Sequence, residues 1–157
     1  MKKLLAAALA VASLVSFVSC AKKDAVKAEG KVLNIYVWND EFSDRFNSYF
    51  ASKVPADVTV NFVQTPNADN AYQNKLDEVL LNQESAAADD KVDVFLVEAD
   101  YALKYVDTPY TLDVKKDIGL TDADLAQQFK YTKDIMTDSN GVLKGVSWQG
   151  CPGGFIY

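Results

Sequence analysis

Three short apolar segments mark the first hundred residues of the chain. Residues 32–38 and 92–97 are almost continuously apolar and rich in branched side chains, a pattern typical of strands that are covered on both faces. Residues 58–63 alternate more visibly between apolar and polar positions, as half-buried strands do. The pattern therefore predicts three strands, near 32–38, 58–63 and 92–97.

Two stretches with helical spacing separate these strands. Apolar residues recur at i, i+4, i+7 and i+8 near 42–52 and near 69–84, as Phe42, Phe46, Tyr49 and Phe50 in the first stretch and Tyr72, Leu76, Val79 and Leu80 in the second. Pro55 follows the first helix, and Asp69 or Asn70 is available to cap the second. We interpret both stripes as core, packed against the sheet.

The order strand, helix, strand, helix, strand predicts an α/β fold, with an open, mostly parallel sheet and helices on both faces. Such sheets bind ligands at the carboxyl ends of their strands. Here two of these ends are followed by polar and aromatic residues. They are Trp38, Asn39, Asp40 and Glu41 after the first strand, and Glu98, Ala99, Asp100 and Tyr101 after the third. We expect the loops 39–41 and 98–101 to be neighbours.

The rest of the chain has weaker signals. Thr121 is placed to cap a helix that carries Leu125 and Phe129. The sequence Asp-Ser-Asn-Gly at 138–141 is typical of a turn, and it leads into the apolar residues 142–146. The last residues, Phe-Ile-Tyr, have the pattern of a strand that has only begun, so we expect the chain to be cut off there.

The first twenty residues form an export signal. Lys2 and Lys3 precede an apolar run, 4–18, that is shorter than the roughly 18 to 20 residues of a spanning helix. The segment resembles a bacterial lipoprotein signal, in which cleavage occurs before a cysteine that carries a diacylglycerol and is often acylated on its amino group. Cys20 takes that position, and the alternative is an ordinary secreted protein with a chance cysteine. We expect residues 1–19 to be removed, residues 20–31 to be a flexible tether from lipidated Cys20, and residues 32–157 to form the folded domain.

Charge and composition narrow the function. The chain has 16 lysine and arginine residues, of which Lys2 and Lys3 lie in the signal. Without the signal, the chain keeps 14 basic and 22 acidic side chains, a net charge of about −8. Nucleic acid and polybasic membrane contacts need clustered cations, so neither is expected. The chain has no histidine and two cysteines. This excludes Ser-His and Cys-His catalysis and the usual zinc sites within it, and we expect no metal and no cofactor.

Several motifs together resemble one family. They are the acylated N-terminus, the strand 32–38 running into Asn-Asp-Glu-Phe, the block 92–101, and Lys-Gly-Val-Ser-Trp at 144–148 followed by Pro-Gly-Gly-Phe-Ile-Tyr at 152–157. The chain is similar to the extracellular solute-binding lipoproteins of bacterial ABC importers, and most of all to the carbohydrate-type group. The resemblance implies that residues 32–157 are the first lobe of a two-lobe, periplasmic-binding-protein-like (type II) fold.

The same resemblance implies a function and a place. The protein would capture a sugar or similar polar solute between its lobes and deliver it to the permease subunits of the importer, without covalent chemistry. It would be extracytoplasmic and anchored by lipid to the cell membrane, on the periplasmic or cell-surface side. Which solute it takes is left open.

Sugar sites pair aromatic planes with carboxylates and amides, because sugars present apolar C–H faces and rings of hydroxyls. The chain offers planes and polar tips near the predicted strand ends and in the 147–157 segment. The candidate ligand-binding residues are therefore Trp38, Asn39, Asp40, Glu41, Glu98, Asp100, Trp148, Gln149 and Tyr157.

Some of these residues have structural alternatives. Trp38 is also placed to close the core at the end of a strand. Asp40 and Glu41 are also suited to the acidic first turn of the following helix, where its dipole favours them. Asp100 is also available to cap a short helix that holds Tyr101 and Tyr105.

An enzyme on the same scaffold is the main alternative function. Thiaminase I enzymes resemble these binding proteins, and Cys151 falls where their nucleophilic cysteine lies. The Pro-Gly-Gly that follows departs from that loop, and a thiolate needs a base or a positive neighbour, of which Lys144 is the nearest lysine in sequence. A purely structural or adhesive lipoprotein is a third possibility.

Overall fold

The computed structural model describes residues 30–150 of the chain. Its helices and strands in chain order are β1 (Val32–Val37), α1 (Glu41–Tyr49), β2 (Thr59–Gln64), α2 (Ala71–Leu81), β3 (Val94–Phe95), α3 (Leu103–Val106) and α4 (Lys130–Ile135). Short 3-10 turns, η1 (Ala51–Lys53), η2 (Ala68–Asn70) and η3 (Ala88–Asp90), join them. The signal segment, the lipid-accepting cysteine and most of the tether, predicted above within 1–29, lie outside the described residues.

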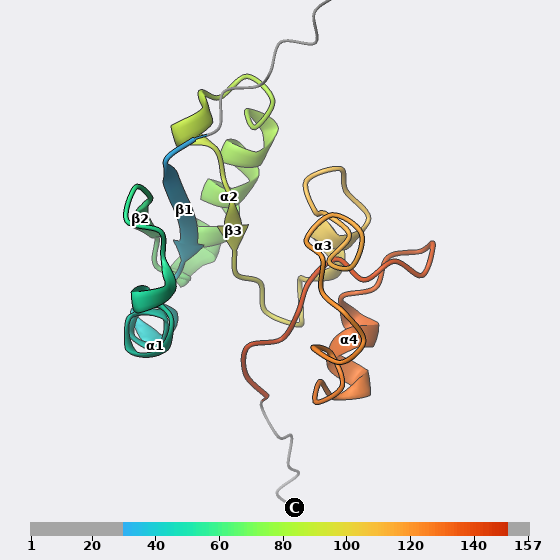
Figure 1. Ribbon diagram of the computed structural model, residues 1–157. Coiled ribbons are helices and arrows are strands. Elements are labelled where there is room, and N and C mark those ends of the chain that lie inside the picture. Colours follow the sequence, from blue (N-terminus) through green and yellow to red (C-terminus); the bar gives the residue numbers. More distant parts are fainter. Residues whose placement is uncertain (1–29, 151–157) are drawn as a thin grey trace, which may run out of the picture.

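The three strands form one sheet with the order β2-β1-β3, and both pairings are parallel (Figure 1). In the register, Val32 lies beside Thr59, and Ile35 lies beside Val94. This confirms the predicted α/β class and the parallel arrangement of the three strands. Because the pairings are parallel, the carboxyl ends of all three strands lie at one edge of the sheet.

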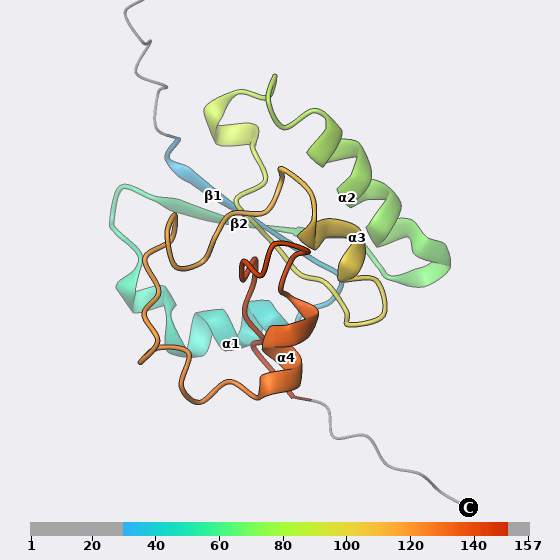
Figure 2. The ribbon, with the colours of Figure 1, turned by 90° about the vertical axis from the view of Figure 1, so that its right-hand side faces the viewer.

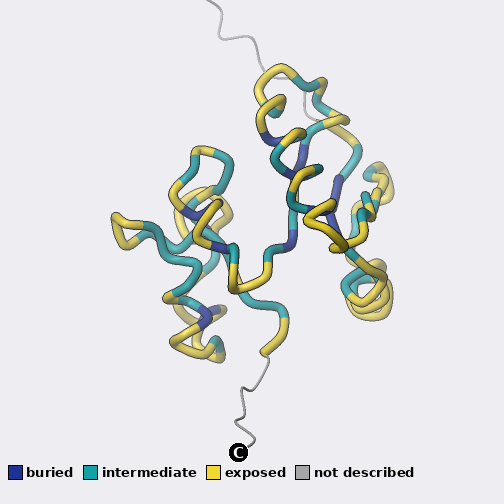
Figure 3. The backbone as a smooth tube through the Cα atoms, turned by 180° about the vertical axis from the view of Figure 1, so that it is seen from behind, coloured by how far each residue is buried: buried dark blue, intermediate teal, exposed yellow. Residues whose placement is uncertain are grey.

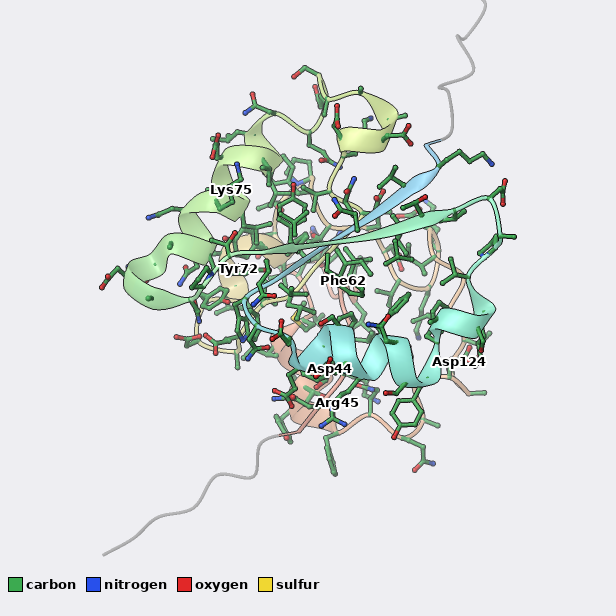
Figure 4. All side chains as sticks on the ribbon, turned by 90° about the vertical axis from the view of Figure 1, so that its left-hand side faces the viewer. Asp44, Arg45, Phe62, Tyr72, Lys75 and Asp124 are labelled. Atoms are coloured by element: carbon green, nitrogen blue, oxygen red, sulfur yellow. The ribbon has the colours of Figure 1, made fainter. Side chains whose placement is uncertain are left out.

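The two longer helices cover opposite faces of the sheet. On one face Tyr36 packs with three buried residues of α2, namely Tyr72, Leu76 and Leu80. On the other face Ile35 and Val37 pack with Phe42 and Phe46 of α1. The alternation of neighbouring β1 residues between the two clusters follows from the two-residue period of a strand. Figure 4 shows the strands running between α1 and α2.

The third strand is shorter than the sequence predicts. Where its regular hydrogen bonding to β1 ends, the side chain of Tyr72 forms hydrogen bonds with the backbone instead. The Tyr72 hydroxyl oxygen lies 2.7 Å from the Leu96 carbonyl oxygen and 3.0 Å from that of Tyr36. The Leu96 N–H in turn donates to the Tyr72 hydroxyl and to the Tyr36 carbonyl, each at 3.1 Å. Leu96 therefore stays beside β1 although the regular strand ends at Phe95.

A buried asparagine holds the other end of the sheet. Asn34 is 4% exposed, and its amide group donates to the carbonyls of Asp89 and Lys91 at 2.8 and 2.9 Å. Its side-chain oxygen accepts from Asn61 of β2 at 2.8 Å, and its backbone N–H donates to the Asp93 carboxylate at 2.8 Å. All of its polar atoms are thus partnered, as a buried amide requires. This network links all three strands near the point where β3 begins.

Residues 101–150 pack along the β3 side of the sheet and contact both faces (Figures 1 and 2). Tyr105 of α3 joins the cluster on the α2 face, while Trp148 packs against the cluster on the α1 face. Asp77 of α2 receives the Tyr105 hydroxyl at 3.0 Å and also pairs with Lys104. The longest buried run of the described residues is 34–37, in β1. Figure 3 colours the buried parts of the backbone dark blue.

One predicted helix is absent from the described residues. Residues 121–128 form successive turns, and α4 begins only after Phe129, whose backbone is extended. Thr121 does make reciprocal hydrogen bonds with Asp124, as in a capping box, but only Leu125 of this stretch is buried. The extended backbone of Phe129 separates these turns from α4, so they do not join it in one regular helix.

The turn predicted at 138–141 is confirmed. Gly141 has a positive φ of 81°, and the Asp138 N–H donates to the Val142 carbonyl at 2.9 Å. Thr137 and Leu143 form an antiparallel bridge across this turn. The prediction for the aromatic stripe of α1 is only half right, because Tyr49 is 76% exposed and Phe50 is 47% exposed. In α2 the stripe is core, as predicted.

We expect Tyr72→Phe to lower the free energy of unfolding by roughly 1 to 3 kcal/mol. The variant keeps the ring but leaves the buried Leu96 carbonyl without its hydroxyl donor, and an unpaired buried group costs about that much. Urea denaturation of residues 30–150 followed by circular dichroism measures the change. Tyr49→Phe, at an exposed position, is the matched control and should leave stability unchanged. Equal stability in both variants would contradict the assigned role of the hydroxyl.

The 101–150 region should lose stability in acid. Hydrogen bonds from the N–H and hydroxyl of Ser139 lower the pKa of Asp107, and hydrogen bonds from Thr121 lower the pKa of Asp124. A carboxyl group whose pKa is lowered in the folded state stabilises that state. This contribution to the free energy of unfolding is complete above about pH 4 and is lost as the pH falls through the lowered pKa. We expect the melting temperature to fall below pH 4, and to fall less in an Asp107→Asn, Asp124→Asn double variant. If the melting temperature of the parent and of the double variant depended on pH in the same way, the role of these two carboxylates would be contradicted.

Candidate functional site

The loop after β1 carries the first predicted site residues. Trp38 is half-buried, contacts both core clusters, and meets the Tyr72 ring edge-on with centroids 5.4 Å apart. The structural alternative for this tryptophan, closure of the core, is therefore observed. Asn39 and Asp40 are exposed. The Asn39 side-chain oxygen accepts the Glu41 N–H at 3.1 Å, which turns the chain into α1.

Asp40 and Glu41 lie at the start of α1, as the structural alternative for these two residues predicts. Asp40 is the residue before the helix, and its carbonyl accepts the Asp44 N–H and the Ser43 hydroxyl. Glu41 is the first helical residue and lies 3.5 Å from Arg45 in an exposed ion pair. The Asp40 carboxylate makes no side-chain cap bond, so it stays available at the surface.

The loop after β2 contributes a residue that the sequence analysis did not select. The Asn67 amide group donates to a carboxylate oxygen of Glu98 at 2.8 Å. Glu98 follows β3, so β1 lies between the two strands that this hydrogen bond connects. The signal was present in the sequence, because the rule that selected the ends of the first and third strands applies equally to the second.

The backbone of the same loop is unusual. Asp69 and Asn70 have positive φ values of 50° and 60°, a conformation that few residues other than glycine adopt. Asn70 precedes α2 but makes no side-chain cap bond, so neither predicted cap is formed. Short polar side chains tolerate this conformation best, and here it brings the chain from β2 into α2 within a few residues.

The segment after β3 is exposed at Glu98 and Asp100 and turns inward at Tyr101. Burial raises the pKa of Tyr101 to about 12, and its hydroxyl has no hydrogen-bond partner within residues 30–150. Asp100 does not cap α3, because Ala102 is the residue before that helix. The structural alternative for Asp100 is therefore wrong, and its carboxylate is exposed beside Glu98.

Trp148 lies against α1 rather than in open solvent. Its ring meets Phe42 edge-on with centroids 5.4 Å apart, and the Arg45 guanidinium carbon lies 5.9 Å from its centroid. Gln128 holds the chain just before it, because its amide donates to the Ser147 carbonyl at 2.9 Å and accepts the Ser147 N–H at 3.2 Å. This double contact fixes the loop 147–150 relative to α4.

A small hollow of about 190 Å³ lies beside this loop, and Trp148 and Gln149 are among its lining residues. A larger one, of about 710 Å³, lies between residues 113–126 and the 137–143 hairpin, and charged residues line much of it. None of the sequence-predicted site residues lines the larger hollow. The predicted residues thus fall into a group at the strand ends and a group in the 147–150 loop.

The described residues show neither a metal centre nor a membrane span. Within 30–150, no three histidine, cysteine or acidic side chains come together in a way that would hold a metal ion. Nor does that part of the chain include a helix with the length and apolar character needed to cross a membrane. Three residues named in the sequence analysis lie outside the described residues. They are Cys20, predicted to accept lipid; Cys151, considered as a nucleophile; and Tyr157, predicted to bind ligand.

We expect Trp148→Ala to lower the free energy of unfolding by roughly 1.5 to 2.5 kcal/mol, about half the loss of a fully buried tryptophan. The reason is that the half-buried ring joins residues 101–150 to α1 through Phe42. Trp148→Phe keeps an aromatic edge there and should lose much less. Urea denaturation compares the two. An unchanged free energy of unfolding in Trp148→Ala would mean that other contacts hold residues 101–150 against the sheet.

Comparisons with known proteins do not identify the chain. No protein-family model matches it, and no curated protein is significantly similar to it. Its function therefore has to be inferred from its residues and from the geometry of the part that the structure describes.

Proposed function

We propose that this chain is part of an extracytoplasmic solute-binding lipoprotein that captures a sugar or similar polar solute for an ABC-type importer. The single observation that carries the proposal is the parallel β2-β1-β3 sheet whose three carboxyl ends bring polar side chains to one edge. Open α/β sheets bind ligands at that edge. The export signal with Cys20 at its end supports a place outside the cytoplasm.

The chemistry of the edge suits a hydroxylated ligand. The exposed carboxylates of Asp40, Glu98 and Asp100 are acceptors for hydroxyl groups, and Asn67 holds one of them in place through its amide. The half-buried Trp38 adds an aromatic surface beside them. Carboxylates that accept hydroxyl protons, next to an aromatic plane, are a frequent arrangement for binding sugars.

The fold proposed for the whole protein is the two-lobe, type II binding fold, with residues 32–157 in its first lobe. The sequence motifs at 32–42, 92–101 and 144–157 support this, and so does the exposure of the strand-end loops, which leaves room for a second surface to close over a ligand. In that arrangement the ligand would be held between the lobes and released to the permease subunits. No covalent step is part of the proposal.

Lipidation is tested on the protein made from its own gene in a bacterial host. We expect the mature N-terminus to be Cys20 carrying a diacylglycerol, since two or three acyl chains hold a protein on a membrane without a helix. Mass spectrometry of the N-terminal peptide measures this. Cys20→Ser is the control and should move the protein to the soluble fraction. An unmodified N-terminus that begins at another residue would refute lipid anchoring.

Ligand binding is tested by calorimetry with sugars identified from a mono- and oligosaccharide panel. We expect Glu98→Gln to weaken binding by about ten- to a hundredfold, because hydrogen bonds to a charged group contribute roughly 1.5 to 3 kcal/mol and each 1.4 kcal/mol is a factor of ten. Trp148→Ala should weaken it by about 2- to 10-fold, because it removes an aromatic stacking face. Glu84→Gln, at an exposed position away from the strand ends, is the matched control. Cys151→Ser should bind within a few fold of the parent. Normal binding in both test variants would place the site elsewhere.

A further inference from the structure

Two exposed aromatic rings lie in parallel next to the 147–150 loop. Phe129 and Tyr131 are 64% and 56% exposed, and their rings stack with centroids 5.8 Å apart and planes 14° from parallel. Phe129 precedes α4 and Tyr131 lies in its first turn. From the sequence, Phe129 is expected in a helix capped by Thr121. The structure instead leaves its ring on the surface.

These rings and the small hollow form one continuous surface. Phe129 and Trp148 both line the hollow. A Cβ atom added to Gly150 would lie 3.6 Å from the Phe129 ring and 3.6 Å from the Tyr131 hydroxyl oxygen, so the loop backbone runs directly against the ring pair. The Arg45 guanidinium lies over the Trp148 ring, so Trp148 joins this surface to α1.

The floor of the hollow is held rigidly. Gln128 bonds both backbone polar groups of Ser147, and the Thr132 hydroxyl donates to the Phe129 carbonyl at 2.8 Å. Thr132 is only 8% exposed. These contacts fix the backbone at residues 128 and 129 relative to the loop. A preformed surface binds with a smaller loss of conformational entropy than one that must first be ordered.

The lining of the hollow has no charged side chain. It consists of three glutamines, two hydroxyl residues, two aromatic residues and a glycine, namely Gln127, Gln128, Phe129, Thr132, Ser147, Trp148, Gln149 and Gly150. The larger hollow is lined by Asp113, Lys115, Lys116, Asp122 and Lys133 among others. In a chain of which 24% is charged, an uncharged lining of amides beside aromatic planes suits a neutral ligand with many hydroxyls.

We propose that Phe129 and Tyr131, with the uncharged hollow beside them, form a stacking subsite for a neutral oligosaccharide. The inference rests on the proposed function and deepens it by naming the class of sugar and the residues that select it. The C–H face of a sugar unit stacks on the ring pair, while amide groups at the hollow bond its hydroxyls. The Gln127 carboxamide has no hydrogen-bond partner within the described residues, so it is available for this role.

The test is saturation-transfer NMR and titration with maltotriose, cellotriose and xylotriose. On irradiation of the aromatic protons, we expect saturation to reach the sugar C–H protons of at least one of the three. Phe129→Leu and Tyr131→Leu should each raise the dissociation constant about 2- to 10-fold, the range that corresponds to the energy of an aromatic contact, and the double variant more. Tyr131→Phe keeps the ring and should bind within about twofold. Trigalacturonate, which is negatively charged, should bind more weakly than the neutral sugars.

Leu112→Ala and Ile118→Ala are the matched controls, because both side chains are exposed apolar groups outside the lining of the hollow. Each should leave the dissociation constant unchanged. Sugar binding that is equal in the parent and in the Phe129 and Tyr131 variants would overturn the subsite and leave the proposed function standing. Absence of binding by all three trisaccharides in the parent protein would overturn the subsite together with the sugar specificity.

Discussion

The hydroxyl of Tyr72 fixes how the segment after β3 lies beside β1. It sits between the carbonyls of Tyr36 and Leu96 and accepts the Leu96 N–H, so it replaces the ladder at the point where β3 ends. Burial raises the pKa of this phenol, so it stays protonated and keeps its donor. The residue comes from α2, so one side chain joins the helix to two strands. The positions of Trp38 and Glu98, two residues beyond these contacts, depend on it.

The ends of the strands and the 147–150 loop are positioned by different means. At the strand ends, parallel pairing aligns the loops and the Asn67 amide bridges to Glu98 across the sheet. The loop is instead held by Gln128 and by the contact of Trp148 with Phe42. Residues 101–150 contact the sheet on both faces, through Tyr105 and through Trp148. This gives the surface two polar regions with separate supports.

The charge of these two regions differs, and the difference bears on what they bind. The strand ends present exposed carboxylates, which accept hydrogen bonds from hydroxyls and repel anions. The hollow by the 147–150 loop presents amides and aromatic rings without charge. A neutral, hydroxyl-rich ligand satisfies both regions, whereas a phosphate or a uronic acid is repelled by the carboxylates of the first and finds no charged side chain in the lining of the second. The proposal of a neutral sugar follows from taking the two regions together.

The sequence by itself determined the three parallel strands, the helices on both faces, the turn at 138–141 and the strand-end loops. All of these follow from local periodicity, turn residues and the rule for crossover connections, which act over a few residues at a time. Only the tertiary structure decided that Asn67 bonds Glu98, that β3 is short, that residues 121–128 form turns, and that Phe129 is exposed. The reason is that each depends on a partner distant in sequence or on how much surface remains to be buried, and spacing along the chain contains neither.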